Sequence, residues 1–379
     1  SFASRPVLAC LLAALAAPAG AQILDDTRGL GARGEAARRG EIDQLRKVSE
    51  VFARVKSDFV DAIEEPVLAG RCTAAMDRWL GENGLAAAIP PPAPSADRSA
   101  ERIARYWKRL AELARGEADF EKLADACLHG MVDRLDRRTE YLDREKFRDL
   151  AAGARGTAGS GVEPPVKSRL LEGGVLYLRL SQFSERALED FYEALRGAAA
   201  RLAGIVLDLR GNPGGLFHSC IGVSAAFLPE TALVVETKGR ARDSTARYSA
   251  RAQDYRRSGY GRPVFELRED LRAAPLVVLV NRRSAACSEI VAAAMQDHKR
   301  AKVVGEKTFG LGTVQTVIPL GGSEALRLTT ARFYRPSGEP IEEKAVTPDV
   351  QVEHPERFRG YGEPQDPGLP AALKALGGR

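Results

Sequence analysis

Hydrophobic residues recur at helical spacing in the first part of the chain. Between residues 41 and 80, apolar side chains return every three or four positions, which is the period of a helix with one buried face. One stripe occurs twice, first as Cys72, Met76 and Leu80 and again as Cys127, Met131 and Leu135. The pattern therefore predicts a helical N-terminal region, which we place over residues 22–150.

An insertion separates the two repeated stripes. It begins with the proline-rich run 89–94 and continues as a polar amphipathic helix over residues 99–115. The repeat also brings Cys72 and Cys127 to equivalent positions. Two interpretations of these cysteines stay open, a disulfide bond or two small buried residues, because the sequence does not give the Cα separation that a bridge requires.

Strands and helices alternate in the second half of the chain, after a Gly/Ala/Pro linker over residues 151–165. The strand-like runs are continuously apolar and β-branched, which indicates a mostly parallel sheet that is buried on both faces. Strands are predicted over 175–180, 204–209, 276–280, 313–319 and 325–334, and helices over 185–202, 216–228 and 288–297. The fold class is therefore α/β, with a core over residues 166–352 and a C-terminal tail over 353–379.

The first residues have the layout of a signal peptide. Arg5 precedes an apolar run over residues 7–17, and small residues precede Gln22. We therefore expect a signal peptide over residues 1–21, cleaved after Ala21, and an exported, periplasmic protein. No later stretch reaches the ~18 apolar residues of a membrane span, so we expect no transmembrane segment in the mature chain.

Charge and composition narrow the partners. Lys and Arg outnumber Asp and Glu by 56 to 51, and this excess is too small to indicate a nucleic-acid partner. The cysteines and the four histidines have none of the spacings of zinc sites, so we expect no metal and no cofactor. The most basic stretch, residues 238–262, carries eight Lys or Arg residues and three tyrosines. We interpret it as a solvated loop or as a contact surface for protein or peptide, in preference to a nucleic-acid site.

Two loops follow predicted strands, which is where ligand sites form in sheets of this kind. In the loop 208–215, the adjacent Gly214 and Gly215 let backbone N–H groups face an anion or a developing oxyanion, although a tight structural turn is the simpler interpretation of a glycine pair taken alone. The loop 281–289 leads into a helix N-terminus, where the macrodipole favours an anionic nucleophile. These loops are the candidate site.

The motifs of the core follow one another in an order and spacing that resemble those of the C-terminal processing peptidases, also called tail-specific proteases. The resemblance extends from residue 41 to about residue 352 and implies a core similar to Clp proteases and crotonases. The motifs that carry it are LD at 135–136 with EYLD at 140–143, YLRLSQF at 177–183, DLRGNPGG at 208–215, PLVVLVN at 275–281, SEIVA at 288–292, GEKTFG at 305–310, LTTARFY at 328–334, PSG at 336–338 and TPD at 347–349.

The resemblance implies a mechanism in which a neutral lysine takes the proton of a serine nucleophile. The family pattern Ser-Ala-Ser-Ala-Ser-Glu places the nucleophile at Ala286, and the pattern Phe-Gly-Lys-Gly places the base at Leu311. Gln315 stands where the lysine-orienting glutamine would be. The oxyanion hole is expected from the backbone amides of Gly214, Gly215 and Cys287. The nucleophile and the base are therefore both expected to be lost.

The family usually carries a PDZ domain between its helices and its core. Here only the linker 151–165 occupies that interval, so we expect no PDZ domain and no such site for binding a substrate C-terminus by strand addition.

Other side chains in and near the loop 281–289 are candidates for replacement catalytic groups. Cys287 is a stronger nucleophile than serine, but its backbone N–H is expected to face the oxyanion hole, so its side chain should point away. Ser284 and Ser288 are the remaining hydroxyls, and we predict that Ser288 is the N-cap of a helix over 289–297. Lys307, a conceivable replacement base, is predicted to be solvated.

The sequence thus predicts an exported pseudoprotease that binds a peptide or a protein partner, such as an active protease relative. The alternative is an active C-terminal processing endopeptidase that uses Cys287, Ser284 or Ser288. A third class, an acyl-binding protein that uses Gly214 and Gly215, follows only from the crotonase-like core.

Overall fold

The structure, a computed structural model, describes residues 35–85, 103, 107, 117–155, 164–198, 201–255, 267–353 and 360–377. The chain divides into two compact units. The helical unit comprises residues 1–156, 239–241 and 315–330, and the core unit comprises residues 157–238, 242–314 and 331–379. The predicted signal peptide and the proline-rich run 89–94 lie outside the described residues.

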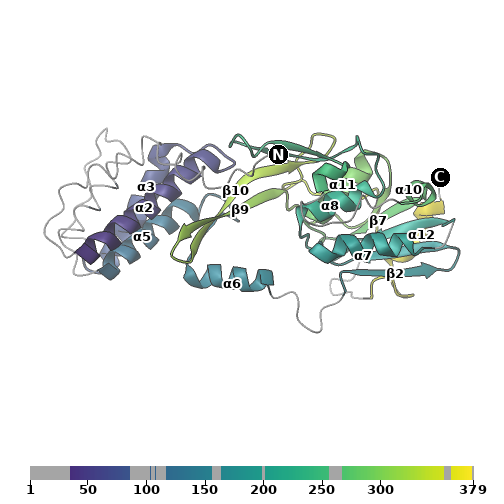
Figure 1. Cartoon of the computed structure of the whole chain (residues 1–379), viewed down its shortest axis with the longest axis horizontal. Helices are drawn as coiled ribbons and strands as arrows, with labels where there is room; N and C mark the ends of the chain where they lie inside the picture. The colour runs from purple at the N-terminus through teal and green to yellow at the C-terminus, as the bar shows by residue number, and fades with distance from the viewer. Residues whose placement is uncertain are drawn as a thin grey trace, which may run out of the picture. The chain divides into compact units, whose positions relative to one another are not determined.

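Among its described residues, the helical unit contains the long helices α2 (Glu35–Asp58), α3 (Glu65–Glu82) and α5 (Glu117–Val132) (Figure 1). Their apolar stripes meet in one buried cluster, which also contains Ile103 and Trp107 of the insertion. Cys72 of α3 and Cys127 of α5 form a disulfide bond, which decides between the two interpretations of the sequence. Gly130 permits this close packing, because a Cβ there would lie 2.5 Å from the Cβ of Ala75.

Part of the predicted linker is helical. Strand β1 (Glu140–Leu142) leads into α6 (Arg144–Arg155), and the N–H of Lys146 donates to Asp143 Oδ1 at 2.9 Å, as at an N-cap. The prediction that a linker begins at residue 151 was therefore wrong, since 151–155 are the last residues of α6. The physical reason is that this alanine-rich stretch has high helix propensity. The remainder, 156–163, lies outside the described residues.

A six-stranded sheet forms the centre of the core unit, in the order β11–β8–β7–β4–β3–β2. All neighbouring strands are parallel except β2 and β3, which are antiparallel, so the predicted mostly parallel sheet is confirmed. Every residue of β3, β4 and β7 is buried. The strands are β2 (Val166–Leu171), β3 (Val175–Leu180), β4 (Gly204–Asp208), β7 (Leu276–Val280), β8 (Lys302–Gly305) and β11 (Val350–Gln351).

Helices cover both faces of this sheet. One face packs against α7 (Glu185–Arg196), α8 (Phe217–Ala225) and α11 (Cys287–Asp297) in the largest apolar cluster. The other face packs against α12 (Gly368–Gly377), through Leu369 and Ala372. The predicted C-terminal tail is therefore in part a structural element of the core, because α12 completes the burial of the sheet.

A second sheet has the strand order β1–β10–β5–β6, with β9 also paired to β10. Strands β9 (Thr313–Gly321) and β10 (Glu324–Tyr334) were predicted, whereas β5 (Leu233–Gly239) and β6 (Ala246–Ser249) were not. The described part of the basic stretch 238–262 thus belongs partly to β5 and β6 and to the short helix α9 (Ala252–Tyr255). Another short helix, α10 (Glu269–Ala273), precedes β7. None of the helices among the described residues has the length and apolar character that a bilayer crossing requires.

Candidate functional site

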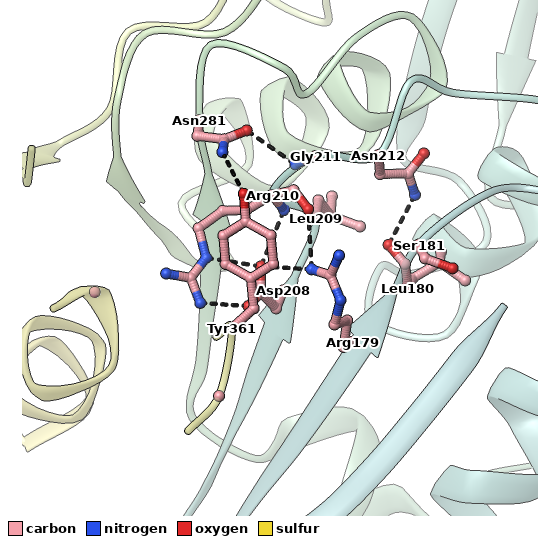
Figure 2. A network of polar contacts seen from close by, with 12 residues as sticks. Arg179, Leu180, Ser181, Asp208, Leu209, Arg210, Gly211, Asn212, Asn281 and Tyr361 are labelled. Atoms are coloured by element: carbon pink, nitrogen blue, oxygen red, sulfur yellow. Dashed lines mark hydrogen bonds and ion pairs between the residues drawn. The ribbon is translucent and has the colours of Figure 1, made fainter. Parts of the chain in front are cut away.

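The loop 208–215 follows β4 and is held in shape by an asparagine. Asn212 Nδ2 donates to the carbonyl of Leu180 at 2.9 Å, a contact drawn in Figure 2, and Asn212 Oδ1 accepts the N–H of Gly214 at 2.8 Å. Asn212 is fully buried. A buried amide that satisfies both a donor and an acceptor fixes the turn. Sequence analysis missed this role, although asparagine before Pro-Gly is a known turn signal.

The glycine pair permits close approach of two chain segments. Gly214 O accepts the N–H of Phe183 at 3.0 Å, and Gly215 has a φ of 142°. A Cβ on Gly215 would lie 2.0 Å from the carbonyl oxygen of Phe183. No side chain fits there, so the glycine is required by the turn as well as being suited to ligand approach.

The loop 281–289 contains a strained residue at the predicted nucleophile position. Ala286 is the N-cap of α11 and has φ 49° and ψ −111°, a conformation that a residue with a Cβ rarely adopts. Its Cβ would lie 2.9 Å from a Cβ on Gly214, so the two loops touch at this point. Strain of this kind costs about 1–3 kcal/mol and collects at functional sites.

Glu289 joins the nucleophile position to the base position. Its Oε2 accepts the N–H of Ala286 at 3.0 Å and the N–H of Leu311 at 2.8 Å. Its Oε1 accepts the N–H of Gly310 at 2.7 Å and the hydroxyl of Thr308 at 2.5 Å. The structure thus brings residues 286 and 311 together around one fully buried carboxylate. Burial raises the pKa of Glu289, and the four hydrogen bonds oppose part of that rise.

The expected oxyanion donors are not equivalent. The N–H of Gly214 is already bonded to Asn212, so it is not available to a ligand. Within the part of the chain that the structure describes, the N–H groups of Gly215 and Cys287 have no hydrogen-bond partner. These two amides remain the candidates for binding a carbonyl or an oxyanion.

Gln315 lies in the part of β9 that belongs to the helical unit. Its Nε2 donates to Thr329 Oγ1 at 2.8 Å. This contact describes its place within that unit, and its role as the residue that orients a base stays a prediction.

The alternative nucleophiles are all buried and hydrogen-bonded. Cys287 is 4% exposed, and its Sγ donates to Gly215 O at 3.4 Å and contacts the thiol of Cys220, so its side chain points into the protein. Burial also raises the pKa of the Cys220 thiol. The hydroxyls of Ser284 and Ser288 donate to the carbonyls of Leu209 and Asn212, at 2.8 and 3.0 Å.

The predicted N-cap was wrong. Helix α11 starts at Cys287 with Ala286 as its N-cap, whereas Ser288 lies inside the first turn and bonds to the loop 208–215. Glu289 takes over the capping by accepting the N–H of Ala286. Lys307 is exposed, as predicted.

The region that contains these loops is similar in sequence to known proteases. The sequence profile described as peptidase family S41 matches residues 174–352. A carboxy-terminal-processing protease of Bartonella bacilliformis is 43% identical over 203 residues, which cover 52% of this chain and 43% of that protein. A carboxyl-terminal-processing protease of Synechocystis is 37% identical over 206 residues, covering 53% and 44%. The matched regions thus amount to less than half of each of these relatives.

A solved structure shows the same fold. The photosystem II D1 C-terminal processing protease superposes with a TM-score of 0.51 at 22% identity, covering 88% of this chain and 97% of that one. The loops 208–215 and 281–289 both fall within the matched residues. Residues 174–352, the core of the chain, thus match peptidase family S41, and this core is similar in sequence to the carboxyl-terminal processing proteases.

Proposed function

We propose that this chain is a pseudoprotease of peptidase family S41, which binds a peptide or a protein partner and does not cut it. One observation carries the proposal: Glu289 Oε2 holds the backbone of both Ala286 and Leu311 within hydrogen-bond distance. These contacts support the proposal that the backbone of a catalytic site is retained at residues 286 and 311, whose side chains have neither a hydroxyl nor an amine.

The chemistry of the family mechanism requires both missing groups. Without a hydroxyl at residue 286 no acyl-enzyme forms there, and without an amine at residue 311 no base stands beside it. Losing such a unit costs a factor on the order of 10⁶ in turnover, the value known for subtilisin. The burial and hydrogen bonding of Ser284, Cys287 and Ser288 argue against a replacement nucleophile.

Binding requires less of the site than cutting does. The N–H groups of Gly215 and Cys287 are available to donate hydrogen bonds to a peptide carbonyl, and an extended peptide backbone supplies such carbonyls at regular spacing. The strained conformation of Ala286 persists without a nucleophile to justify it, which supports retention of the site geometry for binding. The partner class is accordingly an unfolded or extended peptide segment.

Export is part of the proposal. The Cys72–Cys127 disulfide supports it, because disulfide bonds persist in oxidising compartments such as the periplasm. The order of charge, apolar run and small residues at 5–21 agrees with the same compartment.

The experiment that tests the proposal compares the natural protein with the double variant Ala286→Ser/Leu311→Lys. Each is incubated with fluorescein-labelled casein, read by gel for cleavage and by anisotropy for binding, and is then labelled with a fluorophosphonate probe. The natural protein is expected to bind without cutting or labelling, and the double variant is expected to label. The single variants Ala286→Ser and Leu311→Lys are the matched controls, and each should cut and label poorly.

Cleavage by the natural protein that disappears in Cys287→Ala would overturn the proposal in favour of a cysteine mechanism. Cleavage that survives Cys287→Ala but is lost in Ser284→Ala would point to a relocated serine. Absence of casein binding would refute the peptide-binding part.

A further inference from the structure

We propose that residues 360–377, here called the C-terminal latch, hold the loop 208–215 in its binding geometry, with Asp366 and Tyr361 as positioning residues that act through Arg210. The inference concerns the shape of the site and does not depend on whether the chain cuts or binds peptide.

Arg210 is the centre of the contact. Its guanidinium is fully buried, and its Nε donates to Asp208 Oδ1 at 2.9 Å while its Nη1 donates to Asp366 Oδ1 at 2.7 Å. Its Nη2 reaches the second oxygen of both carboxylates. Asp366 is 156 residues away in sequence, so this bidentate pair ties the latch to the start of the loop.

Asp366 of the latch supplies one of the two buried carboxylates that face Arg210. Arg179 adds a second buried cation, whose Nη1 lies 3.8 Å from Asp208 Oδ1 and donates to the carbonyl of Arg210 at 2.9 Å. Without Asp366, Arg210 would lose one of its two buried carboxylate partners, which is strongly unfavourable. The loop therefore depends on the latch for one of the ion pairs that hold it.

Tyr361 extends the contact to the second loop, as Figure 2 shows. Its ring centroid lies 4.4 Å from Arg179 Cζ and 4.7 Å from Arg210 Cζ, so it stacks on both cations. Its hydroxyl accepts a hydrogen bond from Asn281 Nδ2 at 3.1 Å. Asn281 Oδ1 in turn accepts the N–H of Gly211 at 2.9 Å. One tyrosine thus contacts Arg210 in the first loop and Asn281 at the start of the second.

The latch also has hydrogen bonds of its own. Asp366 accepts the N–H groups of Gly362 and Gly368 at 2.7 and 2.9 Å, which orients its carboxylate toward Arg210. A Cβ on Gly362, which has φ 79°, would lie 2.6 Å from the ring of Tyr177. Helix α12 then anchors the segment by burying Leu369 and Ala372 on the sheet. The N–H of Gly215, a candidate donor to a bound carbonyl, lies five residues after Arg210 in the same loop.

The test measures local opening in the full chain by hydrogen–deuterium exchange with mass spectrometry. Asp366→Asn is expected to increase exchange in peptides covering 209–217 by about tenfold or more, at a temperature well below the unfolding midpoint. The matched control is Asp297→Asn, which weakens the Asp297–Arg335 ion pair at the far end of α11 and should leave these peptides unchanged. Tyr361→Phe keeps the stacking and removes only the hydroxyl, so it should increase exchange less, and at 281–283.

A second readout separates positioning from general stability. In the Ala286→Ser/Leu311→Lys background, both aspartate variants should lower the thermal midpoint, but only Asp366→Asn should slow fluorophosphonate labelling, by about tenfold. Unchanged exchange at 209–217 in Asp366→Asn, or an equal rise in Asp297→Asn, would overturn the inference. If Asp366→Asn does not fold, Tyr361→Phe decides, and unchanged exchange at 281–283 would overturn it. If the double variant does not label, the family-derived catalytic positions are at fault, while the exchange result still decides on the latch.

Discussion

Different kinds of chemical group lie on the two sides of the loop 208–215. On one side, Arg210 lies between Asp208 and Asp366, and all three charged groups are buried. On the other side, the loop meets Ala286 and offers backbone amides only. The comparison teaches that the charged groups that hold this loop are separate from residues 286 and 311, the positions at which we propose that the reactive side chains are replaced.

Removing Arg210, the cation between Asp208 and Asp366, should cause the largest loss of stability. Arg210→Met leaves two buried carboxylates without their shared partner, and we expect a loss of about 3–5 kcal/mol in the free energy of unfolding, measured by urea denaturation. Arg335→Met is the control, because its partner Asp297 is 13% exposed and the loss should be clearly smaller. Equal losses would show that the two ion pairs contribute alike.

Removing the carboxylate of Glu289, which lies beside Ala286, should cause the second largest loss of stability. Glu289→Ala leaves three backbone N–H groups and the hydroxyl of Thr308 without their acceptor, and we expect a loss of about 3 kcal/mol, measured by urea denaturation. Glu342→Ala is the control, since Glu342 accepts a single N–H, that of Gly312, and should cost about 1 kcal/mol. A smaller loss for Glu289→Ala than for its control would contradict the role of Glu289 as the joint between the two positions.

Lowering the pH should weaken the ion pairs around Arg210 before it weakens the backbone contacts near Ala286. Burial alone would raise the pKa of Asp366, but its hydrogen bonds with Arg210 hold that pKa below its usual value of 3.8. The unfolded chain therefore binds the proton more readily, so this stabilisation is complete above about pH 4 and is lost as the pH falls through the lowered pKa. The thermal midpoint of the natural protein should fall with pH in this range.

In Asp366→Asn that part of the acid dependence should be absent. The contributions of Asp297 and Asp270 should remain, because their pKa values are also lowered: that of Asp297 against the effect of burial, by its hydrogen bonds with Arg335, and that of Asp270 by its hydrogen bond with Arg268. Identical acid profiles for the two proteins would contradict the assignment.

The smallest expected effect is an increase in stability. Ala286→Gly relieves the strained backbone at φ 49°, and we expect about 1 kcal/mol of added stability, measured by thermal unfolding. Ala285→Gly is the neighbouring control, where φ is not positive, and it should lose about 0.5–1 kcal/mol. A loss in both variants would mean that Ala286 is not strained.

The sequence predicted the core well because local patterns determine it. Strand β3 occupies the predicted residues 175–180, and β7 occupies 276–280, since continuous apolar runs mark buried parallel strands. The positions of the loops 208–215 and 281–289 followed from the same strands. Their contact, of Gly214 with Ala286 and of Asn212 with Ser288, could be expected only through the family resemblance.

Long-range polar contacts could not be predicted in this way. Nothing near Asp366 in the sequence indicates that it pairs with Arg210, because the partner is 156 residues away and an acidic residue in a polar stretch is usually solvated. The N-cap was misassigned to Ser288 for a related reason. Its hydroxyl is taken by Asn212 O, on a different loop, and the strained Ala286 has no sequence signal at all.

The disulfide between Cys72 and Cys127 has a consequence for covalent topology. It closes residues 72–127 into a ring, which includes the proline-rich run 89–94. A single proteolytic nick inside this ring opens it but leaves both pieces attached, so the nicked chain migrates as one species on a non-reducing gel and as two after reduction. In a compartment that contains proteases, the chain tolerates a cut in that stretch without losing its first helices.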